Sequence, residues 1–201
     1  MSIERRLARH VPEVEKAGLV HPAPPELGEE QMGQVIVAAS LALALVGVVT
    51  AALPATRRVE RSAIIDASAE RVFALVSSTE GFQTFNPYKD DEPNLLITPS
   101  GPSRGVGASF AFKGKDTEGR QTIVAMQENK SVTMEIDLGA MGKPVQSFTL
   151  TPQGNQTKVT WATETSFGLN PVGRAFGVMM DSYLGPIYER GLANLDRAAK
   201  P

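Results

Sequence analysis

Residues 35–53 read VIVAASLALALVGVVTAAL, a run of 19 residues without a charged side chain or a proline. About 18 or more apolar residues form a helix long enough to cross the roughly 30 Å hydrocarbon layer of a bilayer. No side of this helix would be polar, which disfavours a place against a soluble core. The sequence therefore predicts a transmembrane helix at 33–54, a polar, partly disordered tail at 1–32 and one domain at 57–201.

A cleaved signal peptide is the alternative interpretation of this run, because TAA at 50–52 is a tolerable cleavage site. Two features argue against it. The run is longer than the usual stretch of about 7–15 apolar residues, and no basic region comes directly before it. Glu29 and Glu30 stand there instead.

The charges around the run bear on its orientation. Arg57, Arg58 and Arg61 follow it closely, so the positive-inside rule places the C-terminal domain of a single-pass membrane protein in the cytoplasm. Four basic residues in the tail act against this orientation. Small residues recur along one face of the helix and allow weak self-association: Ser40, Ala44, Gly47 and Ala51.

The tail has a helical spacing of apolar residues that Pro12 interrupts: Ile3, Leu7, Val11 and Val14. It is expected to be a partly helical tail, with an amphipathic helix for a partner or a membrane surface as the alternative. His10 and His21 have no neighbouring ligands, so no metal site is expected there. Met32 offers an alternative start of translation, which would place the apolar helix at the extreme N-terminus.

Composition excludes several classes of chemistry from the domain. Of the 20 basic and 22 acidic residues of the chain, 16 of each lie in 57–201, so nothing favours nucleic acid. The domain has no Cys and no His, which excludes the usual zinc sites and His-assisted nucleophiles. The loop GPSRGVG at 101–107 precedes a strand rather than a helix, so it predicts a turn and not a phosphate cradle. No cofactor is expected.

The domain reads as a strand at 59–65, two short helices at 69–76 and 79–85, and then a run of strands. Ser68 is the expected cap of the first helix. Alternating apolar residues and short turns predict strands at 95–98, 109–113, 120–127, 132–138, 145–151 and 157–167. In the fourth strand of the chain, Thr122, Val124 and Met126 alternate against Gln121, Ile123 and Ala125.

A long amphipathic helix should end the chain. Asn170 is its expected cap and Pro171 its first residue, and Gly185-Pro186 is expected to kink it. Its apolar stripe is broad: Val172, Phe176, Met179, Met180, Tyr183, Leu184, Ile187, Leu192 and Leu195. An antiparallel sheet that curls around this stripe gives an α+β, helix-grip fold.

Five segments in this order resemble the START-like, or SRPBCC, superfamily, and within it the polyketide cyclase/dehydrase-like proteins with an N-terminal membrane helix. They are VERSAIIDASAERVFALV (59–76), NPYKDDEP (86–93), GPSRGVGASFAFKG (101–114), TKVTW (157–161) and GPIYERGLANL (185–195). The family position before NPY is commonly Trp, and here it is Phe85.

This resemblance implies a deep apolar cavity between the sheet and the long helix, which holds sterols, lipids, polyketides or other hydrophobic molecules. The candidate lining residues are Phe85, Tyr88, Phe110, Phe112, Val124, Met126, Met134, Ile136, Phe148, Trp161, Phe176, Met179, Met180, Tyr183 and Ile187. The expected partners are a hydrophobic small molecule or lipid and the membrane.

No catalytic residue is identified, because fold alone does not assign chemistry. The residues that could supply acid–base groups are Tyr88, Tyr183, Tyr188, Asp181, Glu164, Arg120 and Arg104. A membrane-anchored binding protein is the favoured function. The alternatives are a cyclase or dehydratase acting on a polyketide-like substrate, and a non-catalytic envelope interaction protein.

Overall fold

The computed structural model describes residues 28–200, and the expectations for the helical spacing and histidines of the tail lie outside them. The chain divides into two units, 1–42 and 43–201, and each is described by itself. Helix α1 (Glu29–Ala52) is the one helix within 28–200 that is long and apolar enough to cross a membrane.

The two hydroxyl side chains within 35–53 are bonded to the backbone of α1 itself. Ser40 Oγ donates to the Ile36 carbonyl and Thr50 Oγ1 to the Val46 carbonyl, both at 2.8 Å. Such back-bonding satisfies hydroxyl groups within a helix. The helix is therefore suited to an environment without water, as the sequence predicts.

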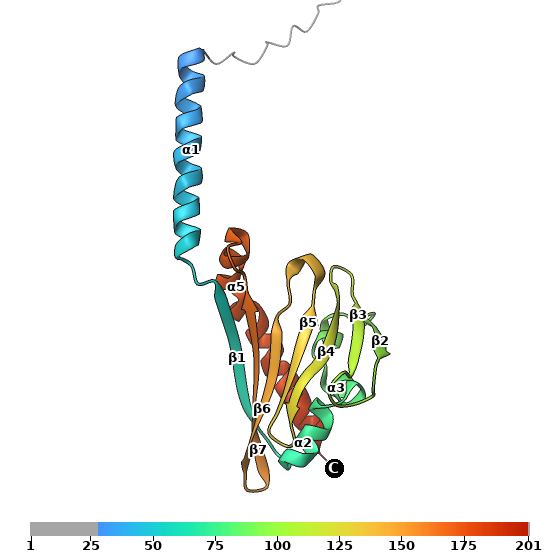
Figure 1. Ribbon diagram of the computed structural model, residues 1–201. Coiled ribbons are helices and arrows are strands. Elements are labelled where there is room, and N and C mark those ends of the chain that lie inside the picture. The colour runs from blue at the N-terminus through green and yellow to red at the C-terminus, as the bar shows by residue number, and fades with distance from the viewer. Residues whose placement is uncertain (1–27, 201) are drawn as a thin grey trace, which may run out of the picture. The chain divides into compact units, whose positions relative to one another are not determined.

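Seven antiparallel strands form one curved sheet in the order β1-β7-β6-β5-β4-β3-β2 (Figure 1). The strands are β1 (Thr56–Ile65), β2 (Leu96–Ser100), β3 (Ser109–Lys113), β4 (Glu118–Gln127), β5 (Ser131–Asp137), β6 (Val145–Gln153) and β7 (Gln156–Ser166). A short 3-10 helix, η1 (Gly139–Met141), lies between β5 and β6. Every expected strand is present, which confirms the α+β helix-grip fold.

A β-bulge in β4 changes which of its residues face the core. The register slips by one residue between Ile123 and Ala125, so Val124 is the extra residue. Ile123, which pairs with Met134, is buried, whereas Val124 is 46% exposed. The expected alternation placed Val124 with the inward residues. Beyond the bulge Met126 pairs with the buried Val132 and shares its face, but Met126 itself is 42% exposed.

Three short helices follow β1: α2 (Ala69–Val76), α3 (Thr79–Phe85) and α4 (Tyr88–Asp91). Ser68 caps α2 by accepting from Arg71 N at 3.3 Å, as expected, and Ser78 caps α3 by accepting from Gly81 N at 3.0 Å. The loop at 101–107 is held against this region, because Gly105 N donates to the Ser77 carbonyl at 2.8 Å. It is therefore a turn that packs on two helices.

Helix α5 (Pro171–Ala199) lies along one face of the sheet (Figure 1). The Asn170 side chain caps it by accepting from Gly173 N at 3.1 Å, and the helix continues through Pro186. Gly191 lets α5 approach β7 closely: a Cβ there would lie 2.4 Å from Trp161 Cζ3. Contact of this kind fixes the distance between helix and sheet.

The apolar stripe of α5 is buried along only half of its length. Met180, Ile187, Leu192 and Leu195 belong to the core. Val172, Phe176, Met179 and Tyr183 are 76%, 55%, 67% and 63% exposed. The expectation that the sheet buries the whole stripe is wrong for its N-terminal half.

Candidate functional site

Aromatic side chains fill the space between the sheet and the C-terminal half of α5. Trp161 stacks on Tyr188 with ring centroids 4.7 Å apart and contacts Phe148 at 4.7 Å. Phe82 and Phe85 close the cluster from α3, with centroids 5.0 Å apart. The deep cavity implied by the family resemblance is therefore occupied at this level by the protein's own side chains.

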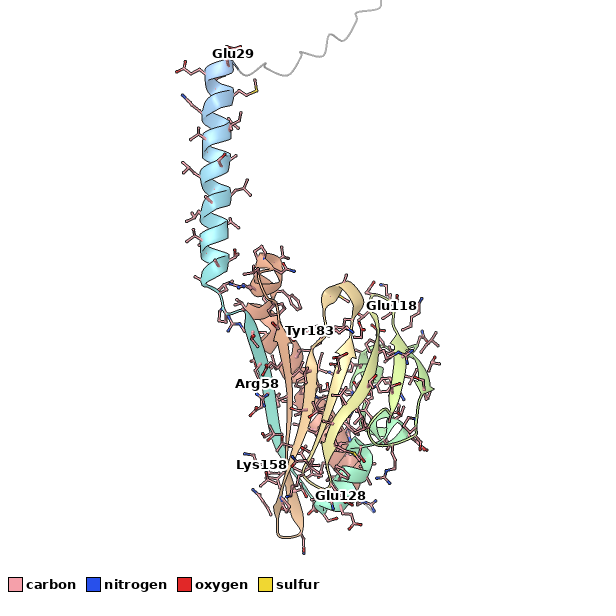
Figure 2. The ribbon with its side chains drawn as sticks, viewed as in Figure 1. Glu29, Arg58, Glu118, Glu128, Lys158 and Tyr183 are labelled. Carbon is pink, nitrogen blue, oxygen red and sulfur yellow. The ribbon has the colours of Figure 1, made fainter. Side chains whose placement is uncertain are left out.

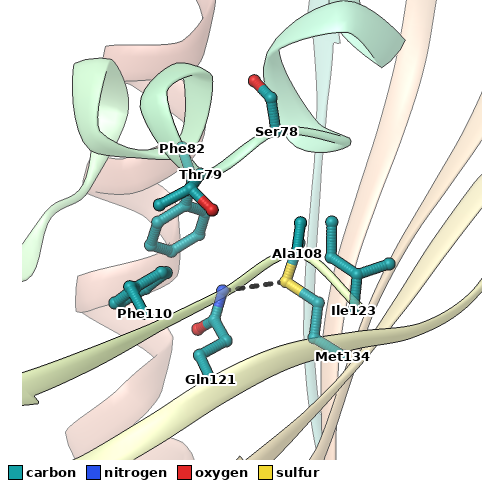
Figure 3. A pocket seen from close by; sticks show the side chains of 8 residues that line it. All are labelled: Ser78, Thr79, Phe82, Ala108, Phe110, Gln121, Ile123 and Met134. Carbon is teal, nitrogen blue, oxygen red and sulfur yellow. Dashed lines mark hydrogen bonds between the residues drawn. The ribbon is translucent and has the colours of Figure 1, made fainter. Parts of the chain in front are cut away.

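A small hole remains beside this cluster, between α3 and strands β3 to β5 (Figure 3). Its volume is about 10 Å³, close to the space that a single water needs. Its lining residues are Ser78, Thr79, Phe82, Ala108, Phe110, Gln121, Ile123 and Met134. It is too small for an organic ligand.

A larger cleft opens at the end of the sheet where β3 and β4 turn, beside η1. Its volume is about 620 Å³, which lies within the range of small-molecule sites. Its lining residues are Leu96, Thr98, Ala111, Phe112, Lys113, Glu118, Gly119, Leu138, Gly139 and Ala140. We call this space the rim cleft.

Aromatic rings connect the rim cleft with the core. Phe112 lies in the cleft and its ring centroid is 6.4 Å from that of Phe110. Phe110 in turn stacks on Phe82 at 5.6 Å, and Phe82 contacts Trp161 at 6.2 Å. An apolar molecule in the cleft would therefore meet a continuous aromatic row at its inner end.

Gly119 shapes the floor of the cleft. A Cβ at this position would lie 2.6 Å from the Asp137 carbonyl oxygen and 2.7 Å from Phe112 Cζ. Only glycine allows Phe112 and Leu138 to close over the strand here. The apolar floor of the cleft thus depends on one residue without a side chain.

The core also contains polar groups on the inner face of the sheet. Gln121 and Gln146 are buried, and both donate from Nε2 to Met134 Sδ, at 2.9 and 3.7 Å (Figure 3 draws the first). Tyr188 donates to Thr163 Oγ1 at 2.6 Å. Burial raises the pKa of Tyr188 to about 12 and raises the pKa of Tyr88 well above its usual range.

These pKa shifts limit the chemistry of the two tyrosines. A phenol with a raised pKa stays protonated at neutral pH, so it can donate a hydrogen bond but is a poor general base. The described residues 28–200 hold no group of three or more His, Cys, Asp or Glu side chains that could bind a metal ion. The polar groups of the core hydrogen-bond one another and are poorly suited to accept a proton.

The other candidate acid–base groups lie outside this core. Asp181 accepts from Arg61 at 2.8 Å on the surface of α5, and this hydrogen bond lowers its pKa. Arg120 donates to Ser100 Oγ at 2.6 Å, and Arg104 donates to Ser77 Oγ at 3.4 Å. Glu164 is exposed. These four side chains, of Asp181, Arg120, Arg104 and Glu164, take no part in the Tyr188–Thr163 hydrogen bond.

The expected lining residues fall into three groups. Phe112 lines the rim cleft, and Phe110 and Met134 line the small hole. Phe85, Phe148, Trp161, Met180 and Ile187 are packed in the core, with Tyr88 and Ile136 partly buried. Val124, Met126, Phe176, Met179 and Tyr183 are exposed.

Several site residues were missed in the sequence. Gln146 and Thr163 could have been found, because each lies two residues from an inward aromatic side chain, Phe148 or Trp161. Gln121 could not, because nothing in the sequence marks the bulge that follows it. Leu138 could also have been found, because it continues the alternation of Met134 and Ile136, whereas Leu96 stands at the end of a strand, where alternation gives no direction.

Comparisons with known structures agree with this fold. A norcoclaurine synthase point mutant from Thalictrum flavum, in complex with a transition-state analogue, matches with a TM-score of 0.56 and 13% identity, covering 72% of this chain and 94% of that one. The ginseng major latex-like protein 151 from Panax ginseng matches with a TM-score of 0.52 and 18% identity, covering 74% and 100%.

A protein from Nitrosospira multiformis matches with a TM-score of 0.51 and 19% identity, covering 71% of this chain and 96% of that one. At these identities the likeness concerns the fold alone. No curated protein matches the chain. The family model described as "Polyketide cyclase / dehydrase and lipid transport" matches residues 56–200, and the chain belongs to this family.

Proposed function

We propose that this protein is a membrane-anchored binding protein for a hydrophobic small molecule or lipid, with 33–54 as its anchor and 57–201 as its binding domain. The rim cleft carries the proposal. Its volume of about 620 Å³ suits one small molecule. Leu96, Phe112 and Leu138 give it an apolar wall of the kind that removes a hydrophobic ligand from water.

Two further observations support binding of a hydrophobic molecule. The family to which the chain belongs is described by lipid transport as well as by cyclase and dehydrase activity. The aromatic row from Phe112 to Trp161 offers more apolar surface inward of the cleft. A ligand longer than the cleft could reach this surface if Phe110 and Phe112 changed their rotamers.

Catalysis has weaker support. A cyclase or dehydratase needs a group that accepts a proton near neutral pH. The two tyrosines of the core have raised pKa values, and Asp181 is paired with Arg61 on the surface. Binding without chemistry therefore accounts for more of the observed groups.

The test is to purify the full chain in a mild detergent, extract it with organic solvent and identify the copurified molecules by mass spectrometry. We expect one class of hydrophobic molecule to copurify in an amount comparable with that of the protein. A chain that copurifies with none, and that binds no member of a panel of fatty acids, phospholipids and polyketides, contradicts the proposal.

A further inference from the structure

The N-terminal half of α5 presents a continuous apolar row to solvent. Val172, Phe176, Met179 and Tyr183 are spaced by four, three and four residues, so they share one side of the helix. Each is more than half exposed, and Leu169, just before the helix, is 91% exposed. We call these five residues the α5 row.

The same side of the helix is covered further along the chain. Ile187, four residues beyond Tyr183, is only 7% exposed. Arg190, on the next turn, donates to the Pro87 carbonyl at 3.4 Å and forms an ion pair with Asp91. Pro87 and α4 thus contact this side of α5 at Arg190, and the exposed α5 row ends before the buried Ile187.

Residues next to the α5 row are hydrogen-bonded to the chain that leaves α1. Arg174 Nη1 donates to the carbonyl oxygens of Ala51 at 2.9 Å and Leu53 at 3.2 Å. Phe167 N donates to the Ala55 carbonyl at 2.7 Å. All of these residues belong to the unit 43–201.

The covalent connection is equally short. Helix α1 ends at Ala52 and β1 begins at Thr56, which leaves three residues between them. Three extended residues span at most about 10 Å. The end of α1 is thus held close to β1 by the backbone and close to the first turn of α5 by the hydrogen bonds of Arg174.

We propose that the α5 row lies in the interfacial layer of the bilayer that α1 spans, so that the domain contacts lipid through this face. The inference rests on the membrane anchor of the proposed function. A row of exposed apolar residues of this length marks an interaction surface. Its position beside the end of an apolar helix selects a lipid surface as the occupant.

The residue types of the row fit such a layer. Phe176 and Met179 supply apolar surface, and Tyr183 combines an aromatic ring with a hydroxyl group, a combination enriched where membrane meets water. Arg174 sits between Leu169 and Phe176 in sequence and keeps its guanidinium on backbone carbonyls. The donors of this charged group are therefore bonded to carbonyl oxygens and do not lie unpaired against the apolar layer.

The chain has no cysteine, so single cysteines can report the environment of each position. The experiment replaces each residue from 172 to 183 in turn by Cys, labels it with an environment-sensitive NBD group and reconstitutes the full chain in phosphatidylethanolamine/phosphatidylglycerol nanodiscs. Quenching by lipids brominated near the headgroup is then compared with quenching by aqueous iodide. Val178→Cys is the matched control, because Val178 is 54% exposed but lies on another side of the same helix.

Two further positions calibrate the measurement. Glu128→Cys reports the far end of the domain, since Glu128 and Lys158 lie at the opposite end of the domain from Tyr183 (Figure 2). Leu43→Cys reports α1. At 172, 176, 179 and 183 we expect blue-shifted NBD emission and a several-fold greater loss of fluorescence to brominated lipid than at 178 or 128. Along 172–183 the quenching by lipid should therefore vary with the period of a helix.

Three results would overturn the inference. In the first, only aqueous iodide quenches labels in the α5 row, while brominated lipid quenches Leu43→Cys. This result would show that α1 lies in the membrane but that the α5 row does not contact lipid. In the second, aqueous iodide quenches the label at Leu43→Cys, which would show that α1 is not in the membrane. A disulfide between two Phe176→Cys chains, with no quenching by lipid, assigns the face to a second copy. Each of these results is independent of whether a ligand copurifies.

Discussion

Tyr188 and Thr163 join the middle of α5 to β7 through a hydrogen bond of 2.6 Å between Tyr188 Oη and Thr163 Oγ1. Both residues are buried, at 1% and 3% exposure. Their contact lies beside the stacked rings of Trp161 and Tyr188. It is therefore the point where polar and aromatic packing jointly fix the helix on the sheet.

Tyr188→Phe removes this hydrogen bond and leaves the Thr163 hydroxyl buried without its partner. We expect the free energy of unfolding to fall by about 1–2 kcal/mol, because a lost buried hydrogen bond adds a desolvation cost. Chemical denaturation of the full chain in detergent, followed by the fluorescence of the single Trp161, measures it. Ser62→Ala is the control: it breaks the exposed bond to Thr160 and should change stability by less than about 0.5 kcal/mol.

The same tyrosines make stability depend on alkaline pH. Burial raises the pKa of Tyr188 to about 12 and that of Tyr88 well above its usual range, while unfolded tyrosines titrate near pH 10. Above pH 10 the unfolded state therefore holds fewer protons than the folded state, and stability falls. The free energy of unfolding falls by up to about 1.4 kcal/mol per pH unit for each tyrosine.

Denaturation curves between pH 8 and pH 12 test this dependence. Stability should be flat below pH 10 and should then decline, with a shallower slope in Tyr188→Phe and in Tyr88→Phe than in the wild type. Equal slopes in all three proteins would contradict the assigned role of burial.

Gly191→Ala tests the close approach of α5 to the sheet. The new methyl group would lie 2.4 Å from Trp161 Cζ3 and 3.1 Å from Pro87 Cγ. Overpacking of this kind costs about 1–3 kcal/mol, more than the ~1 kcal/mol that alanine gains over glycine in a helix. We expect a lower melting temperature, whereas Ser182→Ala on the exposed side should leave it nearly unchanged. A more stable Gly191→Ala protein would show that the helix is free to move away.

Arg57, Arg58 and Arg61 predict that the domain of the proposed membrane-anchored protein lies in the cytoplasm. Lys158→Cys places a single thiol at the far end of the domain, near the label in Figure 2. In intact cells a membrane-impermeant maleimide should label this thiol only after permeabilisation. Labelling of unbroken cells would place the domain outside.

Much of the fold could be predicted from the sequence. The positions of the strands along the chain followed from alternation and short turns, and the cap Asn170 with Pro171 marked the start of α5. Local signals of this kind do not depend on the rest of the molecule. The bulge at Val124 has no such signal, so the face of β4 before it was assigned to the wrong residues.

The site was harder to predict because its volume depends on tertiary packing. Periodicity placed Phe112 and Phe148 on the same inner face, but only the structure shows that one lines a cleft and the other fills the core. The α5 row shows the same limit. Tyr183 and Ile187 belong to one helical stripe, yet Tyr183 is 63% exposed and Ile187 is buried.

Photo-crosslinking in the rim cleft tests the proposed function most directly. The full chain in nanodiscs is exposed to a diazirine fatty acid, and the crosslinked peptides are mapped by mass spectrometry. Ala140→Trp fills the cleft from η1, and Ala193→Trp adds the same side chain at an exposed position of α5 outside the cleft.

We expect crosslinks at Phe112 and Leu138 that fall roughly tenfold in Ala140→Trp, because the indole ring would occupy the volume that the ligand needs. They should persist in Ala193→Trp. Crosslinks at the cleft that survive in Ala140→Trp, or that never form there in the wild type, would contradict the rim cleft as the binding site.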